Sequence, residues 1–95
     1  MTSVKFFYCN NMMVGFELNG HSTVNENDEI GKLVCSAVSS AVIMAANTIT
    51  DVLNLSADVS VDDGYLKLVI DNPNEKSDLI IKGLALHMNE LKNEY

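Results

Sequence analysis

Alternating apolar and polar positions open the chain and predict a β-hairpin. One set of apolar side chains recurs at every second residue over Val4–Cys9 and again over Val14–Asn19, which is the period of a β-strand. The pair Asn10-Asn11 lies between the two runs, and asparagine tolerates the positive φ that a tight turn requires. We expect the second strand to end at Gly20.

A polar loop and an apolar helix are predicted next. Residues 22–30 are mostly polar and predict a loop. From about Gly31 to Leu53 the apolar residues recur at helical spacing. No charged residue lies between Leu33 and Thr50, so we expect this helix to be buried on most sides, against a sheet, a second helix or a partner subunit. Its apolar positions are Val34, Val38, Ala41, Val42, Ala45, Ile49, Val52 and Leu53.

The second half of the chain repeats the order strand, strand, helix. Ala57–Val61 and Tyr65–Ile70 are rich in strand-forming residues, and Asp62-Asp63-Gly64 between them is a strong hairpin signal. Asn72-Pro73-Asn74-Glu75 predicts a helix start, with Asn72 as N-cap and proline at the first helical position. One apolar stripe follows, formed by Ile80, Ile81, Leu84, Met88, Leu91 and Tyr95.

This order of elements predicts the fold class. A single domain over residues 1–95 with the order ββαββα is an α+β, two-layer sandwich: a four-stranded sheet with two helices layered on it. The apolar fraction of 47% is ordinary for a globular chain. The order of the strands in the sheet stays open, because hairpins pair only neighbouring strands.

Composition excludes several classes of function. A net charge of −7, with six lysines and no arginine, argues against direct nucleic-acid binding. The longest apolar run, Leu33–Ala46, has fourteen residues including three serines, so we expect no membrane segment. Two cysteines in unrelated contexts and no secretory signal predict a cytoplasmic protein.

Cys35 is the first candidate for chemistry. On an apolar helix the residue type favours a small core side chain. The alternative is a thiol near a helix N-terminus, where the helix dipole stabilises the thiolate. Ser39 follows four residues later and shares its helix face.

His21 is a candidate general base if the loop folds back over the helix start, or else a surface side chain. His87, at the edge of the second apolar stripe, and Cys9, on the first strand, are interpreted as structural. No Cys-x-x-Cys or His-x-x-x-His spacing indicates a metal site, so we expect no metal and no cofactor.

Three segments together resemble a known family. Two of them are Gly20-His21-Ser22 and, after a polar loop, Leu33-Val34-Cys35-Ser36-Ala37-Val38-Ser39. In this order they resemble the signature of the ribosomal-processing cysteine proteases, known as Prp. That pattern runs Gly-His-Ala/Ser, a loop, and Asp-Ile/Leu-Val-Cys-Ala/Ser-Ala-Val-Ser. The segment Val59–Leu66 is similar to the family's second hairpin.

The resemblance implies a thiol protease of ribosome biogenesis. Such a hydrolase removes a short N-terminal extension from the twenty-seventh large-subunit ribosomal protein, cutting after a hydrophobic, phenylalanine-containing motif. By position, Cys35 would be the nucleophile, His21 the general base and Ser39 a supporting polar group, while Gly20 would allow close backbone approach. The resemblance also implies a homodimer, and a basic ribosomal substrate would suit an acidic enzyme.

Two departures from the pattern keep alternatives open. Lys32 stands where the family has Asp, and the loop before Cys35 is longer. Asp28 or Glu29 could supply the carboxylate instead, and a cationic Lys32 could favour the thiolate. One alternative is a non-catalytic homologue that binds a ribosomal protein or assembly partner, and another is a dimeric structural protein whose only function is its interface.

Overall fold

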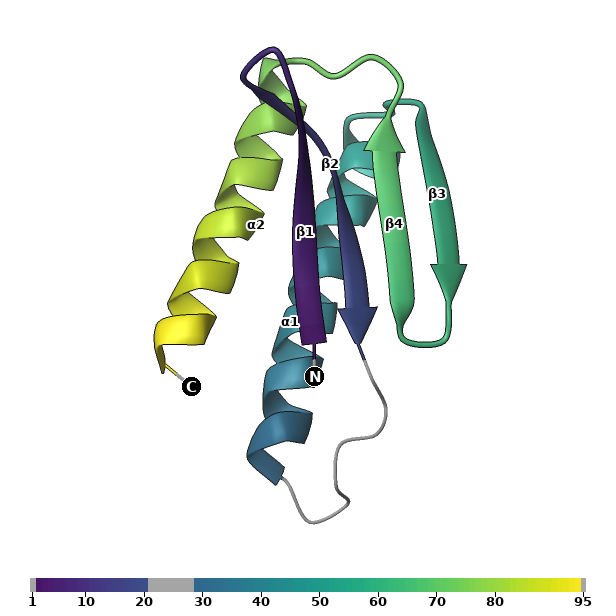
Figure 1. Ribbon diagram of the computed structural model, residues 1–95. Helices are drawn as coiled ribbons and strands as arrows, with labels where there is room; N and C mark the ends of the chain where they lie inside the picture. Colours follow the sequence, from purple (N-terminus) through teal and green to yellow (C-terminus); the bar gives the residue numbers. More distant parts are fainter. Residues whose placement is uncertain (1, 21–28, 95) are drawn as a thin grey trace.

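A four-stranded antiparallel sheet forms one layer of the protein and two helices form the other (Figure 1). The computed structural model describes residues 2–20 and 29–94. The predicted α+β class and the order ββαββα are therefore confirmed. The elements are β1 (Thr2–Cys9), β2 (Met12–Gly20), α1 (Glu29–Asn47), a π-helical turn (Thr48–Val52), β3 (Ala57–Asp62), β4 (Tyr65–Ile70) and α2 (Glu75–Glu94).

Both predicted hairpins are present. Asn10 and Asn11 have φ values of 51° and 67°, the left-handed conformation that a two-residue hairpin turn favours. In the second hairpin, Asp62 pairs with Tyr65 and Gly64 has a φ of 70°. Turn chemistry thus defines where β1 and β3 end and where β2 and β4 begin.

The strand order is β1-β2-β4-β3, which places β2 and β4 at the centre of the sheet. All three pairings are antiparallel. In Figure 1, α1 crosses behind the sheet and α2 runs beside it on the same face. One face of the sheet is therefore covered by the helices.

The core fills the space between the sheet and the helices. Every second residue of β4 is buried, as the two-residue period of a strand requires. Full burial of one such side chain contributes about 1.5–3 kcal/mol. The buried apolar residues are Met13, Phe16, Leu18, Val38, Val42, Ala45, Ala46, Ile49, Leu66, Leu68, Ile70, Ile81 and Leu84.

Helix α1 begins at Glu29, earlier than predicted, and it ends at Asn47 in a π-helical turn. The Leu53 N–H donates to the Thr48 carbonyl at 2.8 Å, five residues back. The Thr48 and Thr50 hydroxyls donate to carbonyls one turn earlier, at 2.7 and 3.0 Å. Hydroxyls bonded in this way are associated with bending of a helix.

Only one side of α1 is buried within a single copy. Leu33, Ile43 and Met44 are 57%, 50% and 66% exposed, so burial on most sides is not seen in one chain. The helical segment Leu33–Val52 is also long and apolar enough, by length and composition, to cross a membrane. That finding differs from our expectation, which rested on the shorter run Leu33–Ala46. In the fold, one stripe of this segment packs into the core.

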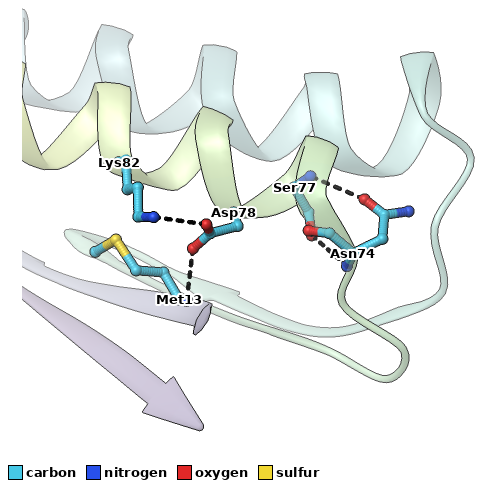
Figure 2. Close-up of polar contacts among 5 residues, drawn as sticks. All are labelled: Met13, Asn74, Ser77, Asp78 and Lys82. Carbon is cyan, nitrogen blue, oxygen red and sulfur yellow. Dashed lines mark hydrogen bonds and ion pairs between the residues drawn. The ribbon is translucent and has the colours of Figure 1, made fainter. Parts of the chain in front are cut away.

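The cap of α2 differs from the prediction. Asn74, rather than Asn72, caps the helix: its side-chain oxygen accepts from the Ser77 N–H at 3.0 Å. In return, the Ser77 hydroxyl oxygen accepts from the Asn74 N–H at 3.0 Å (Figure 2). This reciprocal pair is a capping box with serine in place of the usual glutamate. Pro73 therefore precedes the cap, and Glu75 is the first helical residue.

Asp78 connects α2 to the sheet. Its carboxylate accepts from the Met13 N–H at 2.9 Å and contacts Lys82 Nζ at 2.8 Å (Figure 2). The Lys82 contact and the Met13 N–H lower the pKa of Asp78 below its ordinary value of 3.8. Asp78 thus favours folding only while it is ionised.

Replacing Asp78 by Asn should therefore lower stability in a pH-dependent way. Because the pKa of Asp78 is lowered by folding, its contribution is complete above the unfolded value of 3.8 and is lost as the pH falls through the folded value. Urea unfolding should show the largest difference between wild type and Asp78→Asn near neutral pH, shrinking below about pH 4. Glu90→Gln, at an exposed position of the same helix, is the charge-matched control. A difference that stays constant down to acid pH would contradict this assignment.

Candidate active site

Cys35 lies on α1, where the helix passes under one end of the sheet. It is the seventh residue of the helix and is half-buried. We expected it near the first turn, but because α1 begins at Glu29, Cys35 lies beyond the stretch in which the helix dipole acts most strongly. A local polar contact is therefore the more important feature of its surroundings.

That contact comes from Thr2, the first residue of β1. The Thr2 hydroxyl oxygen lies 2.7 Å from Cys35 Sγ, and either atom could be the donor. Thr2 itself is half-buried and points to the helix side of the sheet, like Val4 and Phe6. Nothing in the sequence pattern singled out Thr2, and only the register of the first hairpin could have located it.

The strand ends around this contact are fixed by backbone pairing. Thr2 pairs with Gly20, the last residue of β2. The Gly20 N–H in turn donates to the Gly64 carbonyl at 2.7 Å. The start of β1, the end of β2 and the β3–β4 turn thus meet at one end of the sheet, at the bottom of Figure 1.

His21 follows Gly20 directly in the chain but lies outside the described residues, as does Asp28. The structure therefore brings Gly20 and Cys35 to the same end of the sheet and leaves the His21–Cys35 pair a prediction. A Cβ atom on Gly20 would lie 3.7 Å from both the Gly64 carbonyl and the Thr2 hydroxyl, which is ordinary contact. Close backbone approach is required at Gly64 instead, whose Cβ would collide with the Gly20 carbonyl.

The remaining candidates are distributed along the fold. Ser39 is half-buried on α1, one turn after Cys35. Cys9 is exposed at the other end of β1, about 20 Å away at ~3.3 Å per residue. His87 is exposed on α2 and lines a groove against α1. Within residues 2–20 and 29–94, no group of three or more potential metal ligands comes together.

The uncovered face of the sheet carries a polar pair close to the same end. The Tyr65 hydroxyl donates to Glu17 at 2.7 Å, across neighbouring strands. This hydrogen bond, with partial burial and the charge of Glu17, raises the pKa of Tyr65 above 10.0. Tyr65 therefore remains a neutral donor at physiological pH and ties β2 to β4 beside the strand ends.

The fold and this site together define a class of protein. It is a two-layer α+β domain in which a half-buried thiol lies at one end of a sheet, in contact with a hydroxyl. Such a thiol is a candidate nucleophile, since thiol chemistry needs both access and a polar environment.

The family model of the cysteine protease Prp matches residues 1–95. The chain therefore belongs to the Prp cysteine protease family, and the resemblance seen in its sequence is confirmed. None of the curated proteins matches this chain.

Solved structures show the same fold. The essential ribosomal processing protease Prp of Staphylococcus aureus, in complex with a substrate peptide, superposes with a TM-score of 0.85 at 19% identity, covering 100% of this chain and 92% of that one. The same protease with a covalently linked product peptide has a TM-score of 0.82 at 20% identity, with the same coverage. SMU.848 from Streptococcus mutans has a TM-score of 0.82 at 22% identity, covering 99% and 85%.

Replacing Gly64 by Ala should destabilise the end of the sheet. Its φ of 70° disfavours any side chain, and the added Cβ would collide with the Gly20 carbonyl. We expect a loss of at least ~1–3 kcal/mol in urea unfolding. Gly83→Ala is the matched control: a Cβ there meets nothing within 4 Å, so it should gain about 0.5–1 kcal/mol of helix propensity. Equal stabilities for the two variants would disprove the constraint at Gly64.

Proposed function

We propose that this protein is a cytoplasmic cysteine endopeptidase that removes an N-terminal extension from the twenty-seventh large-subunit ribosomal protein. The observation that carries the proposal is the position of Cys35: a half-buried thiol at the sheet end where β2 finishes and the chain continues into His21. Family membership over the whole chain supports the reaction class. The substrate peptide bound by the S. aureus relative supports a ribosomal substrate.

In the proposed mechanism Cys35 and His21 act as a dyad. His21 accepts the thiol proton, and the thiolate of Cys35 attacks the carbonyl carbon of the scissile peptide bond. The C–N bond then breaks, and the leaving amine takes the proton from His21, which leaves a thioester on Cys35. A water molecule activated by His21 hydrolyses that thioester and restores the thiol. No metal or cofactor takes part, and Ser39 supports the nucleophile as a polar neighbour.

Charge and redox state are consistent with this assignment. Ribosomal proteins are basic on the face that meets RNA, and a chain with a net charge of −7 attracts such a partner. Both cysteines are free thiols, as is usual where the cytosol keeps thiols reduced. We propose no membrane partner and no direct nucleic-acid partner for this protein.

Lys32 favours one rival function. A homologue without the family's Asp at this position could bind a ribosomal protein or assembly partner without cutting it. Thiol alkylation distinguishes the peptidase from the binding protein. In a peptidase, an activated Cys35 should react much faster at neutral pH than the exposed Cys9. Similar slow alkylation rates for both cysteines would favour the binding protein. A ribosomal protein with a hydrophobic N-terminal extension, encoded in the same genome, would support the proposed substrate.

We also propose that the protein acts as a homodimer, through the outer face of its two helices. Met44 on α1 and Leu79 on α2 are 66% and 67% exposed, and both line a groove of about 350 Å³ between the helices. Two copies that each carry a charge of −7 repel one another. They can approach most easily through α1, which bears no charge over residues 33–47.

The dyad is tested by removing each member in turn. Cys35→Ala should abolish cleavage of a ribosomal substrate that carries its extension, because no nucleophile remains. His21→Ala should lower the rate by about 10²–10⁴-fold, the usual contribution of a general base. Cleavage is followed by mass spectrometry of the released peptide, with Cys9→Ser as the control that should keep its activity. Undiminished cleavage by Cys35→Ala would refute the assignment, and a loss below about tenfold would remove His21 as the base.

The dimer is tested by a charge placed on the apolar groove. Met44→Glu should convert the protein to a monomer in light-scattering chromatography, since two buried carboxylates would face an apolar surface. Val61→Glu is the control: Val61 is 70% exposed but lies on β3, away from the groove. A dimer that survives Met44→Glu and breaks with Val61→Glu would place the interface elsewhere.

A further inference from the structure

Thr2 contacts the candidate nucleophile from a different layer of the fold. Its hydroxyl oxygen lies 2.7 Å from Cys35 Sγ, across 33 positions of sequence. We propose that Thr2 is a positioning residue of the peptidase site, whose hydroxyl holds and stabilises the Cys35 thiolate. This inference rests on the proposed function, because it assigns Thr2 a part in that same reaction.

The direction of the hydrogen bond follows from the protonation state of the sulfur. With a neutral thiol, either group can donate. Once Cys35 has lost its proton, the sulfur can only accept, so the Thr2 hydroxyl must be the donor. A hydrogen bond to an ionised group is stronger than one between neutral groups. The Thr2 hydroxyl is therefore placed to donate to the thiolate that forms during the reaction.

The position of the hydroxyl is set by the sheet. Thr2 pairs with Gly20, and Gly20 is bonded to the turn at Gly64. The β-branched side chain of threonine also has few χ1 rotamers. The hydroxyl is thereby held on the end of the sheet, and it restrains Sγ against rotation on the helix.

Gly20 is also close to the same hydroxyl. A Cβ on Gly20 would be 3.7 Å from the Thr2 oxygen, so the hydroxyl is near both the end of β2 and the thiol. The contact with Thr2 consequently positions the sulfur relative to the end of β2, after which the chain continues into His21. A residue in this place sets the distance between the nucleophile and that strand end.

Thr2→Val removes only the hydroxyl and keeps the branched shape, whereas Thr2→Ser keeps the hydroxyl. Both are made in a Cys9→Ser background, in which Cys35 is the one remaining cysteine, and Cys35 is alkylated with iodoacetamide across a range of pH. We expect Thr2→Val to react about tenfold more slowly at pH 7 and Thr2→Ser to restore the rate. Ser3→Ala, an exposed neighbour on β1, should not change it.

Cleavage kinetics and stability complete the test. In Thr2→Val, kcat for the extended substrate should fall while KM is kept, because the hydroxyl acts on the sulfur and not on the peptide. A Tm equal to that of the parent excludes an effect through folding. If Thr2→Val does not fold, the same comparison is made between Thr2→Ala and Thr2→Ser.

Alkylation of Thr2→Val at the parental rate, or a failure of Thr2→Ser to restore it, would overturn the role of Thr2. The proposed function fails separately, when Cys35→Ala still cleaves the substrate. Because alkylation needs no substrate, the effect of Thr2 on the reaction rate of Cys35 is measured independently of the cleavage result.

Discussion

The pairing of β2 on both of its edges is the constraint on which the rest of the structure depends. On one edge it pairs with β1 and on the other with β4, so its inward side chains Phe16 and Leu18 are buried at the centre of the core. A slip by one residue would turn these side chains to solvent. The same two registers also place Thr2 opposite Gly20 and Gly20 beside Gly64. One set of hydrogen bonds therefore builds both the core and the end of the sheet where Cys35 lies.

Cys35 combines the two interpretations that its sequence left open. It continues the stripe of α1 that is buried at Val38, Val42 and Ile49, so by pattern it is a core position. At Cys35, however, the strands that cover this stripe of α1 come to their ends, because β1 begins at Thr2 and β2 ends at Gly20. The last position of a core stripe thus becomes a half-buried thiol. The packed part of the stripe fixes the helix against the sheet, and the sulfur at the end of the stripe is half-buried.

Local chemistry made most of the fold predictable. The Asn10-Asn11 turn and Gly64 marked both hairpins, and helical spacing marked both helices. The strand order was left open, because it depends on packing between distant elements. The α2 cap was wrongly expected at Asn72, because the local capping box of Asn74 and Ser77 was not recognised.

The Thr2–Cys35 contact at the candidate site was not predicted, because it depends on the register of the first hairpin. A regular hairpin that continued the pairing of Cys9 with Met12 would bring Gly20 opposite residue 1. A bulge between Phe7 and Tyr8 shifts the register by one and brings Thr2 opposite Gly20 instead. Bulges of this kind adjust the direction of side chains, and the extra residue here is Val14 of β2, whose type does not announce it. Cys35 and Gly20 could therefore be selected from sequence, whereas Thr2 could not.

The Thr2–Cys35 contact also bears on whether this chain cuts or only binds. A core position needs only an apolar side chain of suitable volume, and a binding surface for a peptide does not need its thiol hydrogen-bonded to a neighbouring strand. A hydroxyl held 2.7 Å from the sulfur costs desolvation and is useful chiefly when the sulfur carries charge. In the proposed dyad, Lys32 replaces a carboxylate that could have oriented the base, whereas the proposed contact of Thr2 is with the nucleophile. The Thr2–Cys35 contact thus supports the proposed peptidase over the proposed binding homologue.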